Sequence, residues 1–265
     1  MLSTSTPLLR LSQGHLNLLT VCPRKFQHTY LEQLTTPADP DHEERQTLGS
    51  RFHLLMQQQE MGLPIDNFLL ADDKLQSRMS GFAEAAPEIL APGKDDQSFR
   101  ESEHYRTLQI QDYLLTVIYD LLIADQQQAQ IFDWKTSRPA RAKKLAENWQ
   151  TRLYLYVLAE TTTYLPENIS MTYWFFQPKG NPQNVKFNYN SQQHEQTRQE
   201  INQILVNLTY WLQQYQQNQP FPQVPESKQV CKFCQFVMRC DRLETPDATV
   251  GNHIPNLDII QEVLL

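Results

Sequence analysis

Residues 112–136 read D-Y-L-L-T-V-I-Y-D-L-L-I-A-D-Q-Q-Q-A-Q-I-F-D-W-K-T, and this is the most informative stretch of the sequence. Two runs within it, 113–123 and 129–134, are rich in apolar, β-branched and aromatic residues. The residues between them, 125–128, are polar. Two such runs joined by a short polar segment are typical of a β-hairpin. We therefore expect a hairpin at the centre of the protein.

Each predicted strand carries an acid, Asp120 in the first and Asp133 in the second, and Lys135 follows Asp133. Side chains alternate along a strand, so Asp133 and Lys135 point to the same face. If strand pairing also brings Asp120 there, two carboxylates and a lysine converge. Hard divalent cations prefer such oxygen ligands and keep waters that a lysine could orient or help to deprotonate. The alternative is an exposed Asp–Lys pair that contributes little.

The composition is that of an ordinary soluble protein, with 265 residues, 40% hydrophobic and 20% charged. No apolar run approaches the roughly 20 residues that span a bilayer, and the first ten residues do not resemble a secretory signal. We expect a cytoplasmic protein with no membrane partner. The net charge of −7 counts against nucleic acid as a partner, although a local basic strip on an acidic protein can bind DNA.

Three of the four cysteines lie in the segment C-K-F-C-Q-F-V-M-R-C, as Cys231, Cys234 and Cys240, and the fourth is Cys22. Close cysteine spacing without a secretion signal favours a metal site over disulfides. Four thiolates suit tetrahedral zinc or an iron–sulfur cluster, and the spacing alone does not separate these two. Four unrelated free thiols are the remaining alternative.

The pattern of Asp120 followed by D-W-K-T at 133–136 resembles the core of the PD-(D/E)XK nuclease superfamily, in the branch typified by the RecB nuclease domain. The proline that gives the superfamily its name is replaced by Tyr119. Val117 stands where many relatives carry a glycine. Neither departure removes a ligand.

The segment C-P-R-K-F at 22–26 resembles the N-terminal C-P-x-x-F segment of RecB-like nucleases. Among them, the AddB nuclease domain and the CRISPR-associated adaptation exonucleases hold a 4Fe–4S cluster. Their ligands are one cysteine before the nuclease core and three after it, a pattern matched here by Cys22, Cys231, Cys234 and Cys240. The resemblance implies a cluster that joins the N- and C-terminal segments, with a structural Zn²⁺ as the alternative.

Two pairs on predicted helices also resemble motifs of these nucleases. Gly49 and His53 form a G-x-x-x-H pair like the one that relatives place beside the metal, where the glycine permits tight packing. Gln150 and Tyr154 resemble a Q-x-x-x-Y motif, whose Gln faces the site and whose Tyr lies near the nucleic acid. In the alternative, His53 and Tyr154 are core residues and Gln150 faces solvent.

The resemblance implies an Mg²⁺ or Mn²⁺ site held by His53, Asp120, Asp133 and the main-chain carbonyl of Trp134. Lys135 would position or activate the attacking water, and Gln150 and Tyr154 would help to place the nucleic acid. Glu103 falls where relatives often carry a glutamate near the metal; an exposed strand glutamate is the alternative.

We expect one α/β domain over residues 1–265, a restriction-endonuclease-like core in which helices flank a mixed central sheet. The other expected segments are helices on both sides of Cys22 within 9–34, a helix after about residue 40, a helical insertion at about 60–97, a first core strand at 98–111, a loop opened by Arg138-Pro139 and then one long helix running to about Glu160, two paired strands between 171 and 190, a helix at 191–217, a Cys-rich cluster segment at about 222–242, and a tail at 243–265 that could end in a short helix.

The expected function is that of a metal-dependent DNA nuclease, an exonuclease on single-stranded DNA in DNA repair, recombination or CRISPR adaptation. A helicase or a CRISPR integrase is the partner that the resemblance implies. The alternative is a non-catalytic DNA-binding or assembly subunit with the same fold and the same kind of partner. Candidate basic clusters for DNA are Arg24 and Lys25; Arg138, Arg141, Lys143 and Lys144; and Lys228, Lys232 and Arg239.

Overall fold

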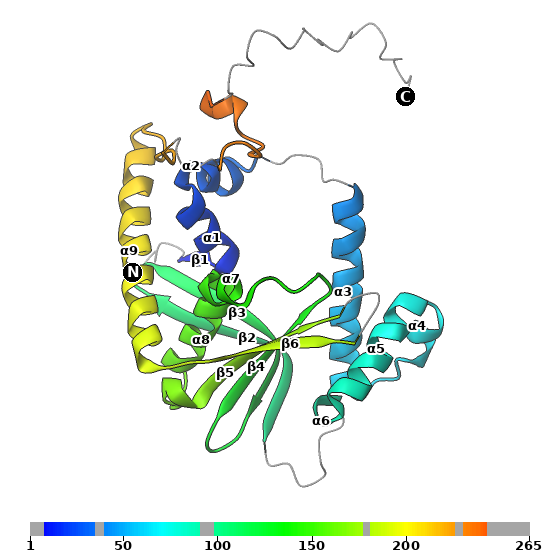
Figure 1. Ribbon diagram of the computed structural model, residues 1–265. Coiled ribbons are helices and arrows are strands. Elements are labelled where there is room, and N and C mark those ends of the chain that lie inside the picture. Colours follow the sequence, from blue (N-terminus) through cyan, green and yellow to red (C-terminus); the bar gives the residue numbers. More distant parts are fainter. Residues whose placement is uncertain (1–7, 35–39, 91–97, 177–180, 226–229, 243–265) are drawn as a thin grey trace, which may run out of the picture.

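A six-stranded mixed sheet lies at the centre of the computed structural model, which describes residues 8–34, 40–90, 98–176, 181–225 and 230–242 (Figure 1). Its strands are β1 (Leu9–Leu11), β2 (Phe99–Ile110), β3 (Tyr113–Ala124), β4 (Ala129–Lys135), β5 (Ile169–Phe175) and β6 (Gln183–Asn188). β3 is the central strand, because β2 pairs with one of its edges while β1 and β4 share the other.

The predicted hairpin is confirmed as β3 and β4, which pair antiparallel up to Ala124 and Ala129 at the turn. Asp125 closes this turn, because its Oδ1 accepts hydrogen bonds from the main-chain N–H groups of Gln127 and Gln128 at 2.7 and 2.9 Å. The ladder between the two strands ends at the pair Leu121–Phe132. Beyond it, β4 continues only beside β5, to which it is parallel.

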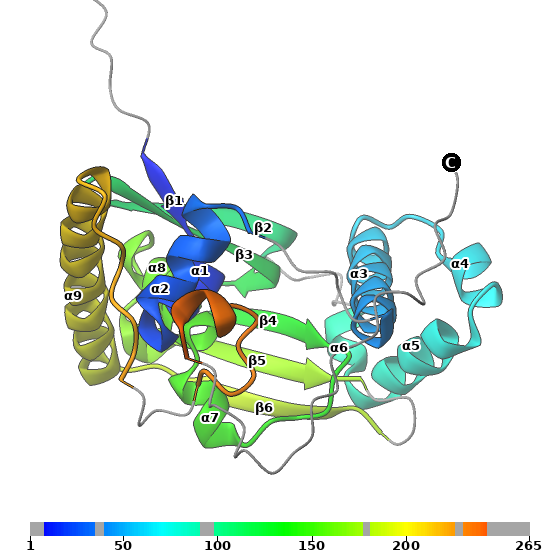
Figure 2. The same ribbon diagram turned by 90° about the horizontal axis from the view of Figure 1, so that it is seen from above.

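Helices cover both faces of the sheet (Figures 1 and 2). On one face, α1 (Gln13–Val21), α8 (Trp149–Glu160) and α9 (Ser191–Gln216) pack on a core that includes Ile131 and Tyr173. On the other face, α3 (Pro40–Glu60), α5 (Asp73–Ala85) and α6 (Pro87–Leu90) pack on their strand neighbours Phe132 and Trp174. Shorter elements are α2 (Pro23–Phe26), the π-helix η1 (Gln27–Leu31), α4 (Asp66–Leu70), α7 (Ala142–Glu147), and the 3₁₀ turns η2 (Pro166–Asn168) and η4 (Met238–Cys240).

Two expectations about the elements are wrong. Residues 9–11, expected to be helical, form β1, in which Leu11 is buried and pairs with Leu115. The single helix expected between the loop at Arg138-Pro139 and about Glu160 is two helices, α7 and α8. They are separated by Asn148, whose backbone is extended. Its side-chain Oδ1 caps α8 by accepting a hydrogen bond from the N–H of Gln150 at 2.8 Å. Asparagine favours such caps because its side chain competes for backbone N–H groups.

The remaining expectations concern the segments around the core. Three helices, α4, α5 and α6, form within residues 60–90, as expected for the helical stretch at about 60–97. The strands β5 and β6 pair antiparallel, and α9 spans nearly all of the expected helix at 191–217. The tail at 243–265 lies outside the described residues. No helix in the described ranges combines the length and the apolar content that crossing a bilayer requires.

We expect Phe82→Ala to lower the free energy of unfolding by about 3–5 kcal/mol, the usual cost of emptying a buried aromatic site. Phe82 is fully buried, and its ring lies 5.1–5.4 Å from the rings of Trp134, Trp174 and Phe176. Urea unfolding measures the change. The matched control is Phe68→Ala in α4, where the half-exposed ring should cost less than about 1 kcal/mol; equal losses in the two variants would contradict this packing.

Candidate active site

Three carboxylates lie in one row across neighbouring strands. In the register of β3 and β4, Asp120 lies opposite Asp133, one position beyond the last bridged pair. In the register of β2 and β3, Glu103 lies opposite Asp120, at the one position that the ladder skips. The pairing therefore brings together acids that are 17 and 13 residues apart in the sequence.

The backbone is irregular at this row. Glu103 has a φ of +50°, in the left-handed region that non-glycine residues rarely occupy. In β3 the alternation also shifts, because Tyr119 and Leu122 belong to the core under α8 while Leu121 belongs to the core under α3. Such strain persists only where the surrounding structure holds it, and it is concentrated at functional sites.

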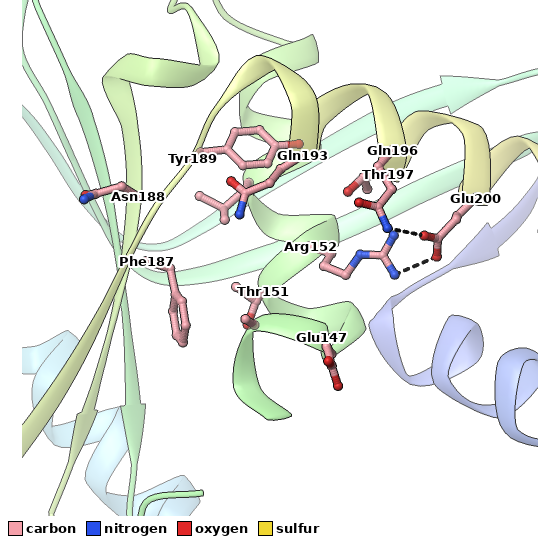
Figure 3. A pocket seen from close by; sticks show the side chains of 12 residues that line it. Glu147, Thr151, Arg152, Phe187, Asn188, Tyr189, Gln193, Gln196, Thr197 and Glu200 are labelled. Carbon is pink, nitrogen blue, oxygen red and sulfur yellow. Dashed lines mark hydrogen bonds and ion pairs between the residues drawn. The ribbon is translucent and has the colours of Figure 1, made fainter. Parts of the chain in front are cut away.

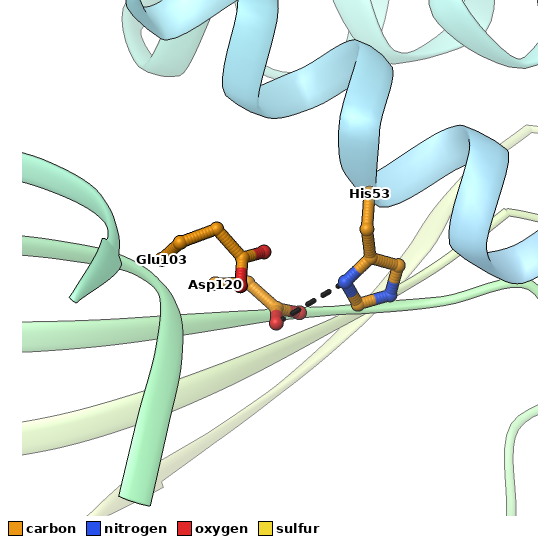
Figure 4. A group of neighbouring side chains, drawn as sticks. All are labelled: His53, Glu103 and Asp120. Carbon is orange, nitrogen blue, oxygen red and sulfur yellow. Dashed lines mark ion pairs between the residues drawn. The ribbon is translucent and has the colours of Figure 1, made fainter. Parts of the chain in front are cut away.

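His53 of α3 lies over the row (Figure 4). Its Nδ1 is 3.2 Å from Asp120 Oδ1, and its Nε2 is 3.0 Å from the carbonyl oxygen of Trp134, to which it can only donate. One ligand atom each from His53, Glu103 and Asp120 lie within 4.8 Å of one another. Gly49, one turn earlier, supports the expected close packing, because a Cβ there would lie 3.4 Å from Thr136 Oγ1.

Asp133 is 2% exposed and is held from two sides. Lys135 Nζ lies 2.5 Å from its Oδ1, as an ion pair without the alignment of a hydrogen bond. Gln150, from the first turn of α8, donates from Nε2 to Oδ2 at 2.5 Å. Asp120 is anchored in turn by the main-chain N–H of Trp134, which donates to its Oδ2 at 2.6 Å.

Tyr154 is buried beside its predicted partner Gln150, with a side-chain hydrogen bond between the two. Burial, followed by the charges of Asp133 and Asp120, raises its pKa. Its side chain is 4% exposed and its ring contacts that of Tyr119 at 5.3 Å, edge to face. Tyr119, at the position of the superfamily's proline, donates its hydroxyl to the carbonyl of Tyr154 at 3.0 Å. The structure thus brings Gln150 to Asp133 and buries Tyr154 next to Gln150, so a contact between Tyr154 and nucleic acid stays a prediction.

A family model described as the PD-(D/E)XK nuclease superfamily matches residues 10–241. The chain belongs to this superfamily. It resembles a solved structure from Eubacterium rectale named "Putative exonuclease", with 9% identity, a TM-score of 0.54, and coverage of 89% of this chain and 90% of that one. A second similar structure, SSO0001, has 14% identity, a TM-score of 0.38 and 91% coverage of both chains. No curated protein sequence matches the chain.

Nucleases of this superfamily use divalent metals, and the group formed by His53, Glu103 and Asp120 could hold such an ion. The donor set fits such an ion: carboxylates suit Mg²⁺ or Mn²⁺, and an imidazole adds a ligand that Mn²⁺ accepts. The sequence motifs predicted His53 and Asp120 as ligands but placed Glu103 only near the metal. A count of residues along β2 and β3 would have found Glu103 only if their register had been known.

The row is accessible from one side. An open hollow of about 640 Å³ lies beside it, lined by Glu103 and by one side of α3, including His53, Gly49 and Gln57. A second hollow, of about 400 Å³, lies between α8, β6 and α9 (Figure 3). It contains none of the three acids, and its Arg152 pairs with Glu200 at 2.8 Å. Of these two hollows, the first is the one lined by residues of the site, Glu103 and His53.

The electrostatics of the row favour bound protons when no cation is present. Burial and the charge of Asp120 raise the pKa of Asp133 to about 7, although Lys135 opposes the shift. Burial and Asp120 also raise the pKa of Glu103. Burial lowers the pKa of His53, but the hydrogen bond and charge of Asp120 outweigh it and raise that pKa. Each group therefore holds its proton more tightly in the folded protein than in the unfolded chain.

All four cysteines line one small cavity beside α2, together with Phe236. Each is a free thiol, and burial raises the pKa of Cys240. Within the described ranges, no three of the sulfur atoms lie within 4.8 Å of one another. Around tetrahedral zinc, with Zn–S bonds of about 2.3 Å, the sulfurs would be only about 3.8 Å apart. The four cysteines predicted as ligands thus line one cavity, but no three of their sulfurs are gathered closely enough to hold a single zinc.

We expect Mn²⁺ to raise the melting temperature more at pH 7.5 than at pH 5.5. The folded-state pKa values of Asp133, Glu103 and His53 are raised, so the bound protons stabilise the folded protein fully only below the pKa values of the unfolded chain. This contribution to stability is lost as pH rises; for Asp133 the loss runs from pH 3.8 to about 7. A cation replaces the lost protons. Melting in EDTA and in MnCl₂ measures the effect.

The control is Asp133→Asn, which removes one of these groups. In EDTA its melting temperature should fall less than that of the wild type between pH 5.5 and 7.5. An equal gain from Mn²⁺ at both pH values would contradict the proton-holding row.

Proposed function

We propose that this member of the nuclease superfamily is a metal-dependent deoxyribonuclease that hydrolyses phosphodiester bonds, acting as an exonuclease on single-stranded DNA. One observation carries the proposal. Glu103, Asp120 and Asp133 lie in one row, with Lys135 paired to the last of them and His53 over the middle one. This arrangement has the donors for a divalent ion and a cation beside it, at the edge of an open hollow.

A bound Mg²⁺ or Mn²⁺ would supply Lewis acidity toward the phosphate and lower the pKa of a coordinated water. The chain's own residues set the geometry for this. Asp120, Glu103 and His53 offer the ligand atoms, and Asp133 and the carbonyl of Trp134 complete the proposed set. The carbonyl of Trp134 already accepts a hydrogen bond from His53 Nε2, and its second lone pair remains available to a metal ion.

Lys135 is the residue proposed to orient the attacking water or to stabilise the charge that develops on the phosphate. Its ammonium is held between Asp133, at 2.5 Å, and the ring of Tyr173, whose centroid is 5.6 Å away. Gln150 fixes the other oxygen of Asp133, so the carboxylate cannot turn toward Lys135 with both oxygens. The lysine thus keeps donor capacity for a substrate.

A basic run supports a polynucleotide substrate. Arg138, Arg141, Lys143 and Lys144 follow β4 directly after Lys135, and all four side chains are exposed. They would bind phosphates beside the acid row, despite the net charge of −7. The similar structure named as an exonuclease supports cleavage from an end. The RecB-like branch, single-stranded DNA, and a helicase or CRISPR integrase partner are proposed from the sequence motifs.

We further propose that Cys22, Cys231, Cys234 and Cys240 hold a 4Fe–4S cluster, with structural Zn²⁺ as the alternative. Their common cavity supports a group that all four share. The protein purified without air is then expected to be brown and to contain iron and sulfide, and Cys234→Ser should bleach it. A colourless protein with one zinc and no iron would exclude the cluster.

We expect Lys135→Ala to slow cleavage of end-labelled single-stranded DNA in Mn²⁺ by about 10²- to 10⁴-fold, the usual contribution of a positioned proton-transfer group. Loss of this cation should leave the sheet intact, because Asp133 keeps the hydrogen bond from Gln150. The matched control is Lys186→Ala, which removes an exposed ammonium on β6, outside the proposed basic run. Its rate should stay within a few-fold of the wild type.

Wild-type rates in Lys135→Ala would refute the catalytic assignment. If neither protein cleaves but both retard DNA in a gel, the non-catalytic binding subunit is the better description. The ladder of products from 5′- and 3′-labelled strands gives the direction of degradation, and a linear duplex run beside them tests the preference for single strands.

A further inference from the structure

The π-helix η1 follows α2 and gathers three polar side chains. The N–H of Glu32 donates to the carbonyl of Gln27 at 3.0 Å, the five-residue spacing of a π turn. Gln27 Nε2 consequently donates to Glu32 Oε1 at 2.6 Å, and His28 Nδ1 lies 2.8 Å from Glu32 Oε2. Isolated π turns of this kind occur frequently at functional sites.

The other side of His28 faces the cysteine cavity. Its Nε2 lies 3.7 Å from Cys240 Sγ, and its ring contacts that of Phe236 with centroids 5.0 Å apart. The side chain is only 3% exposed. Both ring nitrogens therefore have a polar partner, a carboxylate on one side and a sulfur on the other.

The Glu32 carboxylate is itself held by residues from both ends of the sequence. Arg239 Nε, next to Cys240, lies 3.7 Å from Glu32 Oε2. Gln27, which donates to Glu32, accepts the main-chain N–H of Phe221 with its Oε1 at 2.6 Å. The imidazole is thus fixed in position before any group enters the cavity.

We propose that His28 is a positioning residue of the cysteine centre, fixing Cys240 as a ligand and donating an N–H···S hydrogen bond to its sulfur, with Glu32 orienting the ring. A metal-bound thiolate and a carboxylate can only accept, so Nε2 donates to the sulfur, Nδ1 donates to Glu32, and the ring carries both protons in this arrangement. The arrangement has the form in which a carboxylate orients an imidazole at a metal site, here acting through the sulfur. This inference rests on the proposed cysteine centre.

The test compares His28→Phe with His28→Gln. Phenylalanine fills a similar volume without a donor, whereas glutamine keeps an N–H group. In protein purified without air, His28→Phe should lose its iron to a chelator about 10- to 100-fold faster than the wild type, the usual cost of removing such a partner. Its reduction potential should also be more negative, because hydrogen bonds to the sulfurs set the potential of a cluster. His28→Gln should restore both values toward the wild type.

Two further variants exclude simpler explanations. His15→Phe changes a half-buried histidine of α1 that stacks on Tyr30, and it should leave both readouts unchanged. Glu32→Gln leaves the imidazole in place but removes its carboxylate, and it should shift both readouts in the same direction as His28→Phe. It decides the question if His28→Phe does not fold, as judged by circular dichroism. Wild-type iron retention and potential in Glu32→Gln and in any folded His28→Phe would overturn the proposal.

The two proposals fail in different ways. Reduced wild-type protein is also titrated with Co²⁺, whose thiolate bands report binding at the cysteines whichever metal is native. Wild-type protein that holds no iron and gives no such bands refutes the cysteine centre and the role of His28 together. Bands of equal strength and equal midpoint in the wild type, His28→Phe and Glu32→Gln refute the role of His28 alone.

Discussion

The burial of the Asp133 carboxylate is the constraint on which the rest of the site depends. A charge held at 2% exposure is costly unless it is paired. Lys135 supplies one positive charge, but Asp120 lies opposite and Glu103 lies beyond it, so the row keeps an excess of negative charge. The fold tolerates this excess because protons or a divalent cation can neutralise it. Stability is therefore lost at this row as the protons leave, unless a cation replaces them.

The sheet creates the row by an interruption of its own pairing. The ladder between β3 and β4 stops one position before the two aspartates, and β4 then follows β5 alone. Asp120 uses the freed N–H of Trp134 as its anchor, so the backbone group that loses its ladder partner gains a carboxylate. On the other edge of β3, the left-handed backbone of Glu103 marks the same break. Local strain and the site therefore have one origin.

What the sequence predicted depends on how local the cause is. The hairpin and the pairing of Asp133 with Lys135 follow from the two-residue period of a strand, so both were predictable. β1 was missed because three residues carry no periodic signal, and its strand character comes from pairing with β3. The break between α7 and α8 was missed because its cap, Asn148, lies within a stretch whose apolar residues keep helical spacing. The place of Glu103 depends on a register between strands, and the contact of His28 with Cys240 joins residues 212 positions apart.

The cysteine cavity and the acid row are connected through one pair of helices. Cys22 ends α1, and Thr20, two residues earlier, accepts a hydrogen bond from the indole N–H of Trp149 at 2.8 Å. Trp149 begins α8, and its neighbour Gln150 holds Asp133. A group that binds Cys22 to the C-terminal segment restricts α1, and α1 in turn restricts the first turn of α8. On this argument the proposed cysteine centre would support the proposed cleavage by keeping the Gln150 amide in place, without taking part in the chemistry at the phosphate.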